Sequence, residues 1–145
     1  MSKFTCVLCV VALSLSSVYV TRAHKPNLRD AWRSELDECA KEYPVTNDEI
    51  DTAVRSGDSS NLNPCFNFCV FNKTGFFTEN GEYDLKNGLI KLRKAIRDDE
   101  EYTKFEEVAT ECTEDKNTSC DEKAKCDSAN RLSLCFLRFK DKVRI

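Results

Sequence analysis

The 145-residue chain contains one histidine, one methionine, one tryptophan and three prolines. The histidine is His24, so the interior has no imidazole to act as a general base or to bind a metal ion. The sequence also lacks a glycine-rich calcium loop of the kind that small secreted phospholipases use. We therefore predict that the protein is not an enzyme and that it carries no cofactor and no metal.

Residues that interrupt helices are also scarce, because four glycines and three prolines are spread over the whole chain. No segment shows a useful length of the alternation that marks a half-buried strand. Apolar residues instead recur at helical spacing. The expected fold class is all-α, a compact bundle of about six helices. The predicted helices cover residues 28–43, 47–56, 64–74, 85–96, 99–112 and roughly 123–139.

Long apolar runs are absent after the first one, which extends from Phe4 to Val20 behind a positively charged start at Lys3. This pattern, followed by small residues up to Ala23, is typical of a secretory signal peptide cleaved after Ala23. A membrane-anchoring helix is the alternative, since the run is near the shortest length that spans a bilayer. We predict a signal peptide at residues 1–23, one helical domain at 24–145, and no membrane insertion.

Basic residues are fewer than acidic residues. Without Lys3 and Arg22 of the predicted signal peptide, 20 basic residues remain against 25 acidic ones, a formal net charge of −5. An acidic surface does not attract nucleic acid or anionic lipid. We therefore expect neither as a partner.

Cysteine, in contrast, is abundant, with nine in the chain and seven in residues 24–145. In an oxidising compartment so many cysteines indicate a disulfide framework, although Cys65 and Cys69 would also have the spacing of zinc ligands. These two residues are four positions apart on one predicted helix and so share a face, from which they can tie two neighbouring segments. Six cysteines allow 15 pairings, and spacing alone does not choose among them.

Three residues separate Cys65 from Cys69, and eight separate Cys126 from Cys135. With Cys39 and Cys112 added and Cys120 left out, this spacing resembles that of the insect pheromone- and general-odorant-binding proteins. The resemblance covers nearly all of residues 24–145. It implies a helical fold around a hydrophobic cavity and three interlocked disulfides, Cys39–Cys69, Cys65–Cys126 and Cys112–Cys135. Cys120 is then an odd thiol, either free in a loop or paired between two molecules, so we expect a monomer or a weak dimer.

Aromatic side chains are the candidate ligand contacts, although aromatic residues on a helical stripe often only fill a core. The residues proposed to line the cavity are Trp32, Phe66, Phe71, Phe76, Phe105, Phe136 and Phe139. The resemblance places Trp32, Phe71 and Phe136 where the family's pocket walls lie. Some relatives carry a hydroxyl at the position of Phe71, so we expect a more purely apolar site here.

The predicted function is that of a secreted, extracellular carrier of small hydrophobic molecules such as odorants or pheromones, with a chemosensory receptor as a further partner to be considered. An alternative is a salivary, venom or reproductive protein of the same fold that sequesters lipids, amines or a protein partner. Asn117 and Asn72 begin N-glycosylation sequons, Asn117 in a polar loop and Asn72 near the end of a helix. Since His24 is the only histidine, we do not expect a histidine switch to release the ligand.

Overall fold

The computed structural model describes residues 27–114 and 121–145, and all structural statements refer to these residues. They form the helices α2 (Leu28–Ala31), α3 (Arg33–Glu42), α4 (Asn47–Ser56), α5 (Pro64–Lys73), α6 (Leu85–Ala95), α7 (Asp99–Thr113) and α8 (Glu122–Arg138). Over the described ranges the only β-pairing is an isolated bridge between Phe77 and Tyr83. The all-α prediction is therefore confirmed.

The first predicted helix, residues 28–43, is divided in two at Trp32. The backbone of Trp32 has φ −108° and ψ 16°, which departs from helical geometry and separates α2 from α3. Apolar residues recur through the break without losing their spacing, so the pattern predicted one helix where the structure has two. The indole lies at this corner and is buried, with 8% of its surface exposed.

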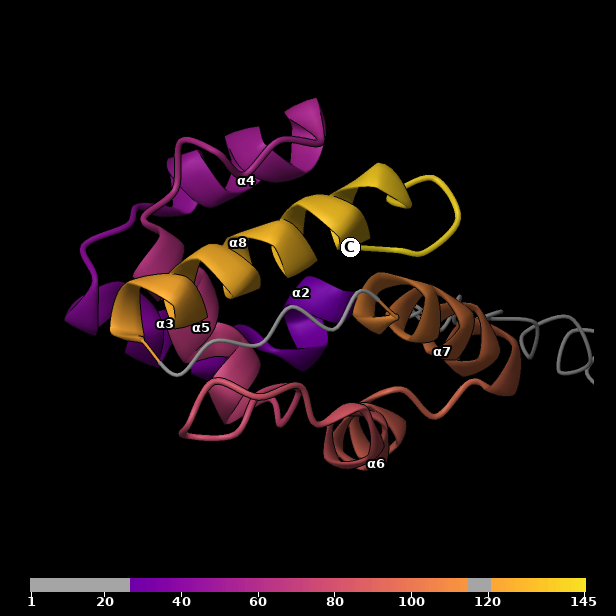
Figure 1. Cartoon of the computed structure of the whole chain (residues 1–145). Helices are drawn as coiled ribbons and strands as arrows, with labels where there is room; N and C mark the ends of the chain where they lie inside the picture. Colours follow the sequence, from indigo (N-terminus) through magenta and orange to yellow (C-terminus); the bar gives the residue numbers. More distant parts are fainter. Residues whose placement is uncertain (1–26, 115–120) are drawn as a thin grey trace, which may run out of the picture.

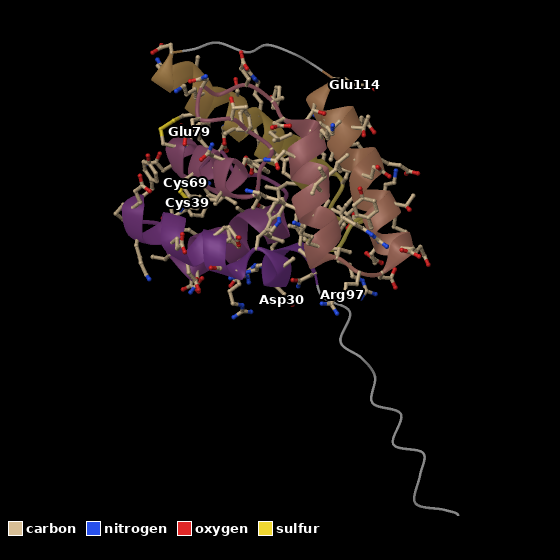
Figure 2. All side chains as sticks on the ribbon, turned by 90° about the horizontal axis from the view of Figure 1, so that it is seen from below. Asp30, Cys39, Cys69, Glu79, Arg97 and Glu114 are labelled. Carbon is tan, nitrogen blue, oxygen red and sulfur yellow. A yellow bond between two sulfur atoms is a disulfide. The ribbon has the colours of Figure 1, made fainter. Side chains whose placement is uncertain are left out.

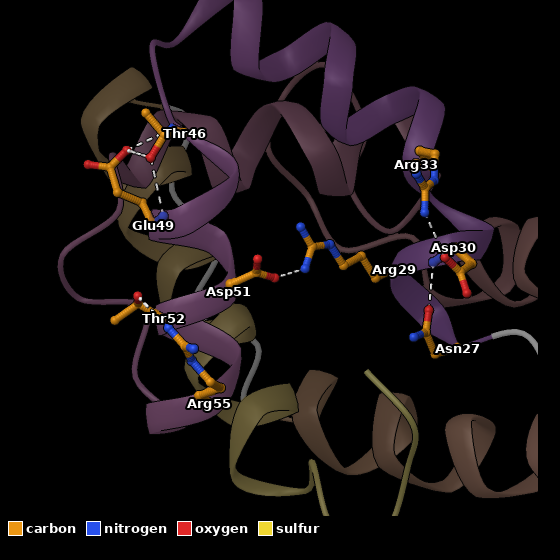
Figure 3. A network of polar contacts seen from close by, with 9 residues as sticks. All are labelled: Asn27, Arg29, Asp30, Arg33, Thr46, Glu49, Asp51, Thr52 and Arg55. Carbon is orange, nitrogen blue, oxygen red and sulfur yellow. Dashed lines mark hydrogen bonds and ion pairs between the residues drawn. The ribbon is translucent and has the colours of Figure 1, made fainter.

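The helix ends follow the capping residues of the sequence. The Asn27 side chain accepts a hydrogen bond from the Asp30 amide, and Thr46 and Glu49 form a reciprocal capping box at the start of α4 (Figure 3). Gly57 ends α4 with φ 74°, a left-handed conformation that glycine adopts without strain. These local signals fix where α4 begins and ends, and thereby which of its residues face the interior.

Helix α5 packs against both α3 and α8, which lie beside it in Figure 1. Its residues Phe66, Asn67, Cys69, Val70 and Phe71 are all buried. Helices α6 and α7 pack against each other, and α7 also packs against α8. Helix α5 therefore links α3, from the N-terminal part of the described chain, to α8 near its C-terminus.

Three disulfides link the helices, with the sulfur atoms at bonding distance. Cys39–Cys69 joins α3 to α5 (Figure 2), Cys65–Cys126 joins α5 to α8, and Cys112–Cys135 joins α7 to α8. The pairing is the one that the family resemblance implies, and it is confirmed. The bridges close segments with sequence separations of 30, 61 and 23 residues. In the chain-entropy model each loop of this length contributes about 3–4 kcal/mol to stability.

No helix within residues 27–114 and 121–145 is long and apolar enough to cross a membrane. The predicted signal peptide at 1–23, the odd thiol Cys120 and the sequon at Asn117 lie outside the described residues. They remain predictions.

Candidate functional site: an apolar cavity

A cavity of about 100 Å³ lies between α2, α3, α4, α5, α8 and the C-terminal segment. Most of the side chains around it are aliphatic or aromatic. The lining residues are Leu28, Arg29, Trp32, Leu36, Ile50, Ala53, Val54, Ser59, Leu62, Phe66, Asn67, Val70, Phe71, Ser133, Phe136, Leu137 and Ile145. Helices α6 and α7 contribute none of them.

Three aromatic rings of the cavity wall form a connected cluster with Phe76, which lies outside the lining. Trp32 meets Phe71 edge to face with ring centroids 6.0 Å apart, and Phe71 stacks on Phe136 at 5.9 Å. Phe76 contacts Trp32 and Phe136 from behind, at 5.9 and 6.0 Å. Centroid distances between 4.5 and 7 Å are favourable for such pairs, so the cluster gives the cavity a firm wall.

The opposite wall comes from α4 and the loop that follows it. Ile50, Ala53 and Val54 recur at helical spacing and share one face of α4, while its polar residues face outward. The capping box at Thr46 and the stop at Gly57 set the register of this face. Local sequence signals thus position the part of the cavity wall that α4 contributes.

Of the seven predicted ligand contacts, Trp32, Phe66, Phe71 and Phe136 line the cavity. Their contact with a ligand stays a prediction. The structure does not place Phe76, Phe105 or Phe139 on this wall. Phe76 is fully buried against Gly88 of α6, Phe105 is 1% exposed within α7, and Phe139 is half-buried at the end of α8. Helical periodicity indicates a buried face but does not tell a solid core from a cavity wall.

The lining of the cavity is mainly apolar but also includes polar residues. Arg29, Ser59, Asn67 and Ser133 belong to the lining, and sequence reasoning missed all four. Asn67 is 5% exposed and lies on α5 among the phenylalanines, and its Nδ2 donates to the Oδ1 of Asn130 on α8 at 3.1 Å. A polar residue inside an apolar helix was the available signal for Asn67. Ser59 lies in a polar loop and had no comparable signal.

A polar groove adjoins the cavity between α2, α3 and α4. Its lining shares Arg29, Leu36 and Ile50 with the cavity, so these three side chains separate the two spaces. Arg29 on α2 forms an ion pair with Asp51 on α4 across the gap between these helices (Figure 3). Since both side chains are partly exposed, we regard this side as the mouth of the cavity.

The C-terminal segment covers another side. The Leu28 amide donates a hydrogen bond to the carbonyl oxygen of Arg144 at 2.8 Å, which ties this segment to α2. Val143 is buried, with 1% of its surface exposed, and Ile145 lines the cavity. The described residues after α8 therefore complete the cavity wall.

Charged groups with shifted pKa values lie on the surface around this site. Lys73 donates to Glu38 at 2.9 Å, and this hydrogen bond and charge hold the pKa of Glu38 below its usual 4.5. Hydrogen bonds from Thr46 lower the pKa of Glu49 in the same way. No group of three or more metal-ligating side chains occurs among the described residues. The mainly apolar lining allows the cavity to hold a guest by burial of apolar surface.

A family model of odorant- and pheromone-binding proteins, the PBP/GOBP family, matches residues 21–138. The chain belongs to this family. Searches of the curated proteins and of the solved structures found no match. The PBP/GOBP family is a family of binding proteins and not of enzymes.

The sequon at Asn72 lies at the end of α5, where the side chain is half-buried. Its Nδ2 donates to the carbonyl oxygen of Phe77 at 3.1 Å. A glycan on this nitrogen would compete with that hydrogen bond. Glycosylation at Asn72 stays a prediction, as it does at Asn117.

Proposed function

We propose that this member of the PBP/GOBP family is a secreted carrier that takes up small hydrophobic molecules, such as odorants or pheromones, and transports them through extracellular fluid. The observation that carries the proposal is the cavity walled by Trp32, Phe71 and Phe136. Interior space surrounded by apolar side chains is unusual in a close-packed core. It supports reversible binding of an apolar guest.

The size of the cavity limits the guest. An engineered apolar cavity of about 150 Å³ binds benzene, and the present one measures about 100 Å³. By this comparison, ligands of roughly four non-hydrogen atoms are expected to fit wholly inside, and larger ones would extend toward the groove beside Arg29. Burial of so small an apolar surface supports affinity in the micromolar range or weaker. Such affinity suits a carrier that also has to release its ligand.

The extracellular setting rests on two features. Three disulfides in one small domain are typical of proteins that fold in an oxidising compartment. The N-terminal segment has the charge, apolar run and small residues of a secretory signal. Both support a role in secreted fluid.

The test is a titration of the oxidised, delipidated protein with an environment-sensitive apolar dye, followed by displacement with small alcohols, esters, ketones and hydrocarbons. Ala53→Leu adds three carbon atoms to the cavity wall and is expected to weaken dye binding at least tenfold. Ala124→Leu makes the same change on α8 outside the cavity and serves as the matched control. Circular dichroism of both variants checks that the helical fold is kept.

We expect saturable one-to-one binding to the wild type and to the control. Dye binding that is absent, or that is unchanged in a folded Ala53→Leu variant, would show that the cavity is not the binding site. The carrier proposal would then fail.

A further inference from the structure

One polar atom beside the cavity has no hydrogen-bond partner. Ser59 lines the cavity, its residue is 0% exposed, and its Oγ finds no partner among the residues that the structure describes. It is the only buried side-chain nitrogen or oxygen of that kind in residues 27–114 and 121–145. Buried hydroxyls are nearly always paired, because an unpaired one loses its bonds to water and gains nothing in return.

Two other polar side chains of the lining, the charged Arg29 and the amide of Asn67, already have partners within the protein. Arg29 forms its ion pair with Asp51, and the amide of Asn67 donates to Asn130. A carboxylate ligand would have to compete with Asp51 for Arg29, or be buried without a counter-ion, which is strongly unfavourable. The free hydroxyl of Ser59 instead suits a neutral oxygen.

We propose that Ser59 is the polar anchor of the ligand site, and that the preferred ligand is a small, mostly apolar molecule with one neutral oxygen, such as a ketone, an aldehyde or an alcohol. The Ser59 Oγ donates to a carbonyl oxygen, or exchanges a hydrogen bond with a hydroxyl group. A serine side chain turns about a single bond between staggered rotamers, so its Oγ can meet the ligand without a change in the backbone. This inference rests on the proposed carrier function and names its ligand class.

Ser59 comes from the loop between α4 and α5, two residues after Gly57. Its carbonyl oxygen accepts a hydrogen bond from the Leu62 amide at 3.0 Å, which closes a turn within the loop. The polar anchor is thus on the α4 side, whereas the aromatic cluster lies on the α5 and α8 side. A ligand between them would place its oxygen toward Ser59 and its carbon atoms toward Trp32, Phe71 and Phe136.

The experiment compares two ligands of nearly equal shape, cyclopentanone and methylenecyclopentane, by displacement of the apolar dye. It uses the wild type, Ser59→Ala, and Ser34→Ala as a matched control, since Ser34 is exposed on α3 and lines no part of the cavity. We expect Ser59→Ala to lower the affinity for cyclopentanone by roughly 2- to 10-fold, the range for one neutral hydrogen bond. Its affinity for methylenecyclopentane should change by less than twofold. The control should change neither.

Thermal unfolding provides a second measurement. Because Ser59→Ala removes an unpaired buried hydroxyl, its unfolding midpoint should equal or exceed that of the wild type. A clear fall in the midpoint would reveal a structural partner for Oγ and overturn the inference. Equal effects on both ligands, or an unchanged affinity for cyclopentanone, would overturn it as well while leaving the carrier function in place. If neither compound displaces the dye from the wild type, both proposals fail.

Discussion

The aromatic residues of this chain show how far single positions can be interpreted. Phe71 and Phe105 both lie on the buried face of a helix, yet Phe71 lines the cavity and Phe105 is packed within α7. The sequence could predict that both are buried, because each falls on an apolar stripe. Which one faces empty space depends on how α4 and α8 meet α5. That geometry involves residues far apart in the chain, so it could not be predicted from local spacing.

Gly88 provides a prediction at the residue scale. It lies inside α6, and the ring of Phe76 is so close that an added Cβ would come within 2.5 Å of Phe76 Cδ1. Helix propensity alone would make Gly88→Ala stabilising by about 1 kcal/mol. We expect the opposite sign, a loss of about 1–3 kcal/mol in the free energy of unfolding, because the ring must move within a packed core.

Denaturant unfolding measures this change, with Lys94→Ala on the exposed face of α6 as the control. A Gly88→Ala protein as stable as the wild type would show that the Phe76 ring can move without a loss of stability. The expectation that Phe76 is tightly packed against Gly88 of α6 would then be wrong.

At the scale of elements, helix ends were predicted better than helix continuity. The caps at Asn27, Thr46, Asn63, Asp84 and Asp98 all accept hydrogen bonds from the first turns of their helices. Such bonds depend on residues two or three positions apart, which the sequence displays directly. The break at Trp32 was missed because the apolar spacing continues through it, while the indole there packs against Phe71 and Phe76, which are distant in the chain.

Three carboxylates with lowered pKa values predict how the stability of the fold depends on pH. The pKa values of Glu38 and Glu49 are lowered from 4.5 by Lys73 and Thr46, and that of Asp58 from 3.8 by Ser60. A group with a lowered pKa stabilises the fold above its unfolded pKa, and this contribution is lost as the pH falls through the folded pKa. Stability should therefore be flat from pH 7 to about 5.5 and should fall below about pH 4.5.

The measurement is the denaturation midpoint as a function of pH, for the wild type and for Glu49→Gln. The midpoint of the variant should fall less steeply below pH 4.5 than that of the wild type, because the glutamine side chain does not titrate. Ligand affinity should change little between pH 7 and 6, since His24 is the only histidine in the chain. A sharp loss of stability or affinity between pH 7 and 6 would contradict this account.

On the scale of the whole molecule, the fold class and the disulfide pairing followed from the sequence, the pairing through the family resemblance and not through spacing alone. The cavity could be expected only as a family property. Its position was not accessible from the sequence, because its walls come from five helices, one loop and the C-terminal segment. Its polar residues were missed for the same reason.

The disulfides should differ in their effect on binding. Cys39–Cys69 ties α3 to α5 beside the cavity, whereas Cys112–Cys135 holds α7, which contributes nothing to the lining. Replacing both cysteines of either pair by alanine should cost about 2–5 kcal/mol of stability. We expect the loss of Cys39–Cys69 to weaken dye binding severalfold more than the loss of Cys112–Cys135, at a temperature where both variants are folded. Equal effects would indicate that the cavity depends on global stability alone.

Trp32 allows the most direct test of the central claim that this cavity is the ligand site. It is the only tryptophan in the chain and it lines the cavity, so its fluorescence reports on the site without a label. The measurement is a titration of Trp32 emission with cyclopentanone in the wild type and in Ala53→Leu. The account predicts a saturable one-to-one change in Trp32 emission in the wild type. The affinity derived from this titration should be at least tenfold lower in Ala53→Leu. Emission that stays constant while the dye is displaced would place the ligand elsewhere and contradict the account.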